Sequence, residues 1–224
     1  MKALAIDSAS SCITFAAIND KKSAILSLNI GMHQSECLIP SIQEVMDKTG
    51  LKPEDLDFTC MDLGPGSFTG LRLAFSALKA FELSHNTPLY GIPTLEACSY
   101  PWSFYTGAVL SVIDAKKNSF YAQVFRNGEK CTDIEDSSVS KIITHIDSEE
   151  NVLVCGPDAA FFVAQARELR PTQNFTLVKG ISASPIHSLL EIANKKFEKN
   201  ESGLAEYDGP LYIRKSEAEL SLKK

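Results

Sequence analysis

The chain repeats one plan of strands and helices, and this internal repeat constrains its fold more than any other feature. An apolar strand that ends on a carboxylate opens the sequence at Ala3–Asp7, and the pattern returns at Val109–Asp114, roughly half the 224-residue chain later. In each half a further strand, a glycine–proline turn and a helix follow the aspartate. The repeat predicts two α/β lobes of similar topology.

The remaining elements are assigned from hydrophobic periodicity and turn residues. Pro40 is compatible with a helix only in its first turn, and Ser67 is a suitable N-cap for a long helix. We assign residues 1–104 to an N-terminal lobe and 105–224 to a C-terminal lobe, whose last segment can pack back on the first. The expected strands are 12–19, 23–29, 58–63, 88–92, 119–127 and 152–155, and the expected helices are 36–48, one that begins near 67, and 158–169.

The aspartates that end the two opening strands are candidate ligand residues. Ligands of open α/β sheets bind at the carboxyl ends of strands, and this layout is that of the actin and hexokinase (ASKHA) superfamily, where paired hairpins hold nucleotide phosphates. A carboxylate that caps a turn is the simpler role, because no lysine or glycine pair follows Asp7. The candidate nucleotide or anion site comprises Asp7, Ser8, Gly66, Ser67, Asp114 and Lys116.

Two common catalytic signatures are missing from the sequence. A P-loop requires G-x-x-x-x-G-K-[ST], but the stretch from Gly64 to Gly70 has other spacing and Leu71 stands where the lysine would be. A metallopeptidase site needs two histidines one helical turn apart, and the four histidines are far apart in the sequence. We therefore expect neither a P-loop nor a metal site.

The helix after Ser67 carries two apolar stripes, which together exceed the ~100° stripe of an ordinary surface helix. One stripe contains Leu73, Ala77 and Phe81, and we expect it to pack on the lobe's own sheet. The other stripe either packs inside the same lobe or binds a partner. The helix at 36–48 offers a matching stripe, and if both stripes face a partner, an isolated chain is expected to form a homodimer. The expected partner interface comprises Leu38, Ile42, Val45, Phe68, Leu71, Arg72, Phe75 and Leu78.

Charge and composition limit the cellular location and the kinds of partner that we expect for this chain. The net charge is -6, and the densest basic cluster is Arg214-Lys215 with Lys223-Lys224, so tight binding of a nucleic acid by the chain alone is not expected. Asp7 interrupts the first apolar run, and no later run approaches the roughly 20 apolar residues that span a bilayer. The six cysteines form no C-x-x-C pair. We expect a cytoplasmic protein with no membrane association.

Several short motifs resemble one known family along nearly the whole chain. The stretch Leu63-Gly64-Pro65-Gly66-Ser67-Phe68-Thr69-Gly70-Leu71-Arg72 is similar to the G-P-G-S-[FY]-T-G-[VL]-R signature of the TsaB (YeaZ) family. Four further stretches resemble the family's motifs, in its order: Leu4–Ser8, Gly91–Leu95, Ile113–Lys116 and Pro210–Arg214.

The resemblance implies a pseudo-enzyme that supports the synthesis of N6-threonylcarbamoyladenosine in tRNA. Members of the family are similar to the transferase TsaD, pair with it through their N-terminal lobes, and complete a complex with the ATPase TsaE. ATP and metal would then belong to the partner subunits. An active ATP-dependent small-molecule kinase or ATPase of the same superfamily is the alternative, and older glycoprotease labels would imply a metallopeptidase.

The sequence departs from the family pattern at two places. Gln34 stands where a histidine is usual, and Asp62-Leu63 stands where Gly or Ala and a basic residue commonly precede the G-P-G turn. Both departures affect what can be expected of the interface or of a ligand site near these residues. They do not affect the resemblance to the family as a whole.

Overall fold

The computed structural model describes residues 1–178 and 184–214, which form two units. Unit 1 comprises Met1–Thr94 together with the chain from Ser184 onward, and unit 2 comprises Leu95–Ala183. The first boundary lies after Thr94, before the expected boundary at residue 104, and the helix that follows unit 2 packs on the sheet of unit 1. Of the predicted basic cluster, Lys215, Lys223 and Lys224 lie outside the described residues.

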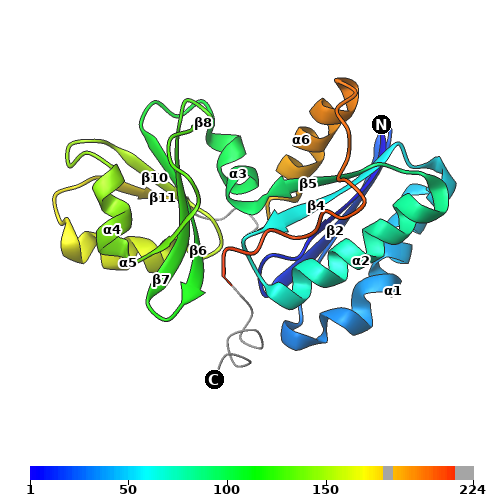
Figure 1. The fold of residues 1–224 in the computed structure, drawn as a ribbon, viewed down its shortest axis with the longest axis horizontal. Helices are drawn as coiled ribbons and strands as arrows, with labels where there is room; N and C mark the ends of the chain where they lie inside the picture. The colour runs from blue at the N-terminus through cyan, green and yellow to red at the C-terminus, as the bar shows by residue number, and fades with distance from the viewer. Residues whose placement is uncertain (179–183, 215–224) are drawn as a thin grey trace. The chain divides into compact units, whose positions relative to one another are not determined.

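Within the described residues, unit 1 contains a five-stranded sheet in the order β3-β2-β1-β4-β5 (Figure 1). The first three strands are antiparallel, while β4 is parallel to both β1 and β5. The strands are β1 (Lys2–Asp7), β2 (Cys12–Asn19), β3 (Lys22–Asn29), β4 (Phe58–Gly64) and β5 (Leu89–Pro93).

Helices cover both faces of this sheet. Helices α1 (Gln34–Thr49) and α2 (Phe68–His85) pack on one face, and α6 (Ile186–Glu198) packs on the other, where the Phe197 ring lies 5.4 Å from that of Phe58. The side chain of Ser67 accepts a hydrogen bond from the Gly70 N–H, as predicted for an N-cap. Gly50 ends α1 in the left-handed conformation, with a φ of 69°. Glycine adopts this conformation without steric cost.

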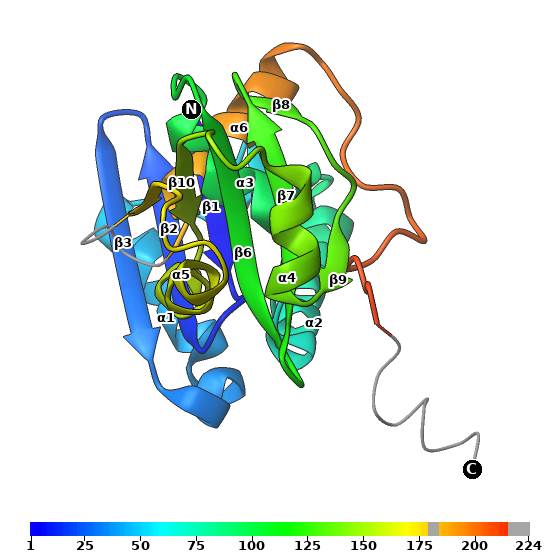
Figure 2. The same ribbon diagram turned by 90° about the vertical axis from the view of Figure 1, so that its left-hand side faces the viewer.

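Unit 2 repeats this arrangement with its own sheet, in the order β11-β10-β6-β7-β8 with β9 paired to β7 (Figure 2). Strand β6 pairs antiparallel with β7 and parallel with β10, as β1 pairs with β2 and β4 in unit 1. The elements are α3 (Thr94–Ser99), β6 (Ala108–Lys116), β7 (Ser119–Arg126), β8 (Glu129–Lys130), β9 (Glu135–Ser137), α4 (Val139–Ile142), β10 (Val152–Cys155), α5 (Ala159–Leu169) and β11 (Phe175–Leu177). The predicted duplicated mixed-sheet fold is confirmed.

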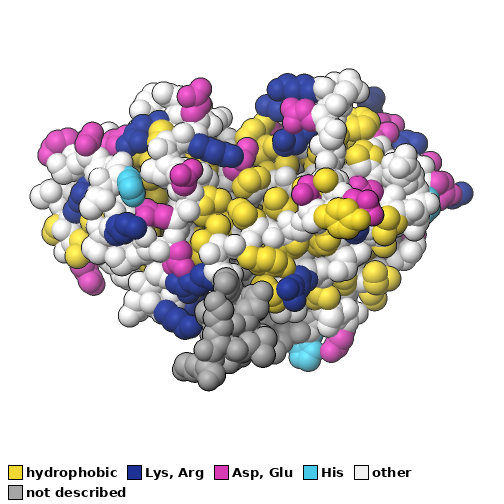
Figure 3. All heavy atoms as spheres, viewed as in Figure 1, with side chains coloured by type: hydrophobic (Ala, Val, Ile, Leu, Met, Phe, Trp, Pro, Cys, Tyr) yellow, Lys and Arg dark blue, Asp and Glu magenta, His cyan; other side chains and the backbone are white. Residues whose placement is uncertain are grey.

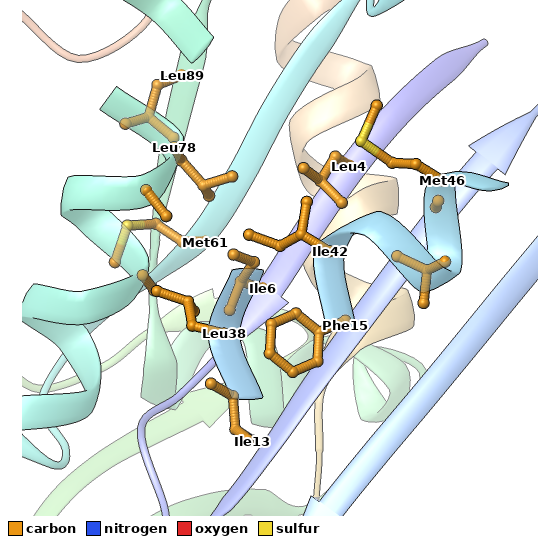
Figure 4. Close-up of a cluster of buried hydrophobic side chains, with 14 of the residues drawn as sticks. Leu4, Ile6, Ile13, Phe15, Leu38, Ile42, Met46, Met61, Leu78 and Leu89 are labelled. Carbon is orange, nitrogen blue, oxygen red and sulfur yellow. The ribbon is translucent and has the colours of Figure 1, made fainter. Parts of the chain in front are cut away.

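A hydrophobic core lies between the sheet of unit 1 and its helices α1 and α2 (Figure 4). Strands β1 and β2 contribute Leu4, Ile6 and Phe15, all fully buried, because alternate side chains of a strand point to the same face. Leu78 of α2 is fully buried in the same cluster. In the core of unit 2, the rings of Phe120 and Phe162 meet edge to face with centroids 5.2 Å apart.

No helix among the described residues is both long enough and apolar enough to span a bilayer.

The burial of Leu78 gives a stability prediction for unit 1. Replacing Leu78 with Ala should lower the free energy of unfolding by roughly 2 to 5 kcal/mol, through lost transfer energy and a residual cavity. Urea denaturation followed by circular dichroism measures this change. The matched control is Leu83→Ala on the same helix, where the side chain is 77% exposed. Surface truncations have small effects, so equal losses in the two variants would contradict the placement of Leu78.

Candidate functional site

The loop between β1 and β2 is held by carboxylates of its own unit. The Ser8 N–H donates to Oδ1 of Asp62, at the end of β4, over 2.9 Å. The Ala9 N–H donates to Oδ1 of Asp7 over 3.3 Å. This second bond is the turn-capping role considered for Asp7. Two amides that follow the strand, the groups that could bind a phosphate, therefore already have intramolecular acceptors.

Asp7 and Asp62 form a buried pair of carboxyl groups. Their side chains are 2% and 0% exposed. Burial raises the pKa of Asp7 to about 6, and burial together with the charge of Asp7 raises the pKa of Asp62 well above its usual range. Among the described residues, Oδ2 of Asp62 and the hydroxyl of Ser8 have no hydrogen-bond partner. The pair strongly favours sharing a proton over carrying two charges.

The pairing of Asp62 with Asp7 is not among the sequence predictions. In the sequence, Asp62 stands out only because it departs from the family motif. That departure is the one sequence feature that could have pointed to its pairing with Asp7. This carboxyl group, two residues before Gly64, lies near the end of β4 and beside the end of β1, since these strands are parallel neighbours.

The glycine turn after β4 packs directly against the same loop. The Ser67 N–H donates to the Ala9 carbonyl over 2.7 Å, and a Cβ on Gly66 would lie 2.6 Å from the Ala9 Cβ. A Cβ on Gly70 would collide with the Ser8 carbonyl oxygen. Glycine is therefore required at both positions by close backbone approach. The Gly64–Pro65 peptide bond is cis.

Gln34 closes the remaining side of this loop. Its Nε2 donates to the carbonyl oxygens of Ser10 and Ser11 over 3.3 and 3.4 Å, and its side chain is buried. The residue that replaces the family's usual histidine thus contacts the loop of the candidate anion site.

The corresponding turn of unit 2 is also satisfied internally. The Asp114 N–H donates to Asp158 over 2.8 Å, and the Asp114 carboxylate accepts bonds from both the backbone N–H and the ammonium group of Lys116, at 2.7 and 2.6 Å. Although burial opposes the change, the bonds from Lys116 lower the pKa of Asp114. The structure therefore brings Asp114 and Lys116 together, as an ion pair.

The predicted partner interface needs correction. Five of its residues lie in the core of unit 1, because the stripe that contains them faces the sheet: Leu38, Ile42, Val45, Leu71 and Leu78. Of the stripe that was expected to pack on the sheet, Ala77 is buried in the core, and Leu73 and Phe81 are partly buried and pack against it. Phe68 and Phe75 are also partly buried, and Arg72 is exposed.

Within the described residues, no group of three or more His, Cys, Asp or Glu side chains could hold a metal ion. The buried Asp7–Asp62 pair has only two such side chains, one fewer than this kind of group requires.

Two units with the same strand pairing, each with an antiparallel hairpin beside parallel strands, define the actin/hexokinase class of α/β proteins. The fold is similar to that of the activator of the 2-hydroxyisocaproyl-CoA dehydratase from Clostridium difficile with bound ADPNP, which matches 92% of this chain and 100% of its own, with a TM-score of 0.53 and 10% identity. YeaZ from Pseudomonas aeruginosa matches 95% of this chain and 99% of its own, with a TM-score of 0.77 and 19% identity.

Residues 30–222 match the family model of TsaD, tRNA N6-adenosine threonylcarbamoyltransferase. Several relatives carry the name tRNA threonylcarbamoyladenosine biosynthesis protein TsaB, among them one from Escherichia coli and one from Bacillus subtilis. The Escherichia coli relative is 29% identical over 138 residues, and the Bacillus subtilis relative is 23% identical over 187 residues. The chain thus belongs to the TsaD family and, within it, to the TsaB (YeaZ) group.

These relatives are matched to different extents. The alignment spans 58% of this chain and 57% of the Escherichia coli relative, but 81% of this chain and 80% of the Bacillus subtilis relative.

The buried carboxyl pair predicts a pH-dependent stability. The pKa of Asp7 is about 6 in the folded state. An unfolded aspartate has a pKa of about 3.9, so between these values the folded protein binds a proton that the unfolded chain does not. The contribution of Asp7 to stability should therefore rise by about 1 kcal/mol as the pH falls from 7 to 5, and this gain should be lost as the pH rises again through 6. Protonation of Asp62, whose pKa is also raised, acts in the same direction. Urea unfolding at each pH measures this contribution.

The Asp62→Asn variant is the matched comparison, because an amide oxygen can still accept from the Ser8 N–H while the neighbouring charge is removed. The variant should be at least as stable as the wild type at neutral pH and should show a weaker pH dependence. An unchanged pH dependence would show that the pair does not titrate as inferred.

Proposed function

We propose that the chain is a non-catalytic subunit in the biosynthesis of N6-threonylcarbamoyladenosine in tRNA. In this proposal it pairs with TsaD and works with the ATPase TsaE, and ATP and metal bind to those partners. A cytoplasmic location and the lack of tight tRNA binding by the chain alone belong to the same proposal. Family membership and the names of its TsaB relatives support it.

The observation that carries the non-catalytic role is the closed loop between β1 and β2. A nucleotide-binding hairpin needs backbone N–H groups directed at phosphates. Here the N–H groups of Ser8 and Ala9 donate to Asp62 and Asp7, and negative charge on this carboxyl pair would oppose any phosphate. The glycine turn leaves no space between the loop and α2, because backbone atoms of the two already touch.

The turn of unit 2 supports the same interpretation. The carboxylate of Asp114 is neutralised by Lys116, and the backbone N–H of Asp114 is bonded to Asp158. In both turns, the N–H groups closest to the strand-ending aspartates already have acceptors within the chain.

The outer face of α2 is the surface that we propose for pairing. Phe68, Arg72 and Phe75 remain from the predicted interface, and Figure 3 shows hydrophobic side chains gathered over α2 and the C-terminal segment beside it. The prediction of self-pairing by an isolated chain depends on Leu71 and Leu78, which are buried in the core. A homodimer that forms through α2 would therefore use the outer residues instead.

The first test of this function is copurification. A tagged chain expressed in its own cells should retain TsaD, and the pure chain with ATP and magnesium should release no ADP above the buffer background. Boiled protein is the control for contaminating turnover. ADP release by the pure chain, without TsaD in the eluate, would favour the alternative of an ATP-dependent kinase or ATPase.

A second test concerns the carboxylate of unit 2. Asp114→Asn should leave tRNA modification by the reconstituted complex largely unchanged, since the reaction belongs to the partner. Stability should change by no more than about 1 kcal/mol, because ion pairs with a solvent-exposed partner contribute little. Lys116 is such a partner. Quantification of the modified nucleoside by mass spectrometry measures the outcome. A large loss of modification in a folded variant that still pairs would assign chemistry to this chain.

A further inference from the structure

The C-terminal segment after α6 is fastened along the sheet of unit 1. The Leu204 N–H donates to the Leu89 carbonyl of β5 over 2.8 Å, and the Leu211 N–H donates to the Leu63 carbonyl of β4 over 2.6 Å. A Cβ on Gly64 would lie 2.6 Å from the Leu211 carbonyl oxygen, so this glycine permits the close approach. The segment that resembles the family's last motif is thereby held beside its central one (Figure 1).

This attachment brings Tyr212 onto the outer face of α2, beside Phe68 and Arg72. The Phe68 and Tyr212 rings lie 4.8 Å apart. The Arg72 guanidinium lies 3.9 Å from the centre of the Phe68 ring and 5.6 Å from that of Tyr212. Both separations are within the range of cation–π attraction. The Nε of Arg72 donates to the Tyr212 hydroxyl over 3.0 Å. Two aromatic rings and one hydrogen bond therefore fix the orientation of the guanidinium.

The guanidinium itself has no anionic partner in residues 1–178 and 184–214, where the ion pairs involve other cations. The next cation along the helix, Lys79, is paired with Glu82. Arg72 is exposed, and Tyr212 and Leu211 beside it are 40% and 37% exposed. An oriented, unpaired arginine among exposed apolar side chains is the composition that interface hot spots favour.

We propose that Arg72 is the specificity-determining anchor of this surface and binds a carboxylate of the partner protein, with Phe68 and Tyr212 as its positioning residues. The inference rests on the proposed pairing with TsaD and names the chemistry of the contact. Nε is occupied by Tyr212, so the terminal nitrogens remain to hold an aspartate or glutamate side chain.

A carboxylate suits this site better than a nucleic-acid phosphate. Proteins that bind the phosphate backbone use several cations together. Arg72 lies among apolar side chains, and although the C-terminal segment also carries Arg214, two residues after Tyr212, the chain as a whole has a net charge of -6. A single ion pair between Arg72 and a partner carboxylate, surrounded by apolar contacts, fits these surroundings.

The test measures the dissociation constant for purified TsaD from the same organism by isothermal titration calorimetry. Arg72→Gln and Arg72→Lys should each weaken binding by at least about tenfold, because lysine keeps the charge but not the planar fork. Tyr212→Phe keeps the ring and removes the hydroxyl, and should weaken binding less. The Arg72→Gln loss should shrink at high salt. Lys199→Gln, just after α6, removes one exposed charge outside this surface and should change nothing.

The outcomes separate the inference from the function on which it rests. Failure of the wild-type chain to bind TsaD overturns the proposed function and this inference with it. Wild-type binding that is equally strong in the folded Arg72 variants overturns the inference alone. If those variants keep TsaD but the assembled complex loses tRNA in a filter assay, Arg72 contacts phosphate instead, and the carboxylate assignment is wrong. Unchanged thermal unfolding confirms that the variants are folded.

Discussion

The arrangement of unit 1 depends on the contact between the loop after β1 and the glycine turn before α2. Hydrogen bonds from Ser8 and Ser67 and two glycines without side chains hold this region together, and Gln34 ties α1 to the same loop. The contact sets the position of α2 on the sheet, because the helix begins directly after Ser67. Its consequence is functional as well, since a loop closed in this way has few donors left for a ligand.

The same turn links the core to the surface. The residues that follow it place Leu71 and Leu78 toward the sheet and Phe68 and Arg72 away from it. Gly64, at the start of the turn, has no side chain and so lets the C-terminal segment pack closely. This packing places Tyr212 beside Arg72. One short stretch of sequence thus closes the loop after β1, packs α2 on the sheet and exposes the proposed partner contact.

Much of the fold could be predicted from the sequence, because it is encoded in local patterns. The strands that contain Asp7 and Asp114 and the cap at Ser67 follow from hydrophobic runs and turn chemistry. The orientation of α2 could not be predicted, since apolar residues surround most of that helix and periodicity cannot say which stripe meets the sheet. The partnership of Asp62 with Asp7 depends on which strands are neighbours, and that of Arg72 with Tyr212 depends on a segment 140 residues away.

The division of the chain has a consequence for synthesis. Unit 2 is encoded by one uninterrupted stretch, whereas unit 1 needs residues from both sides of that stretch. Domains generally fold as units as they emerge from the ribosome. The sheet of unit 1 therefore remains incomplete until unit 2 has been synthesised. Until then, the face that α6 later covers is exposed to water. During that interval the nascent chain exposes an apolar surface, and exposed apolar surface favours aggregation until the segment after unit 2 covers it.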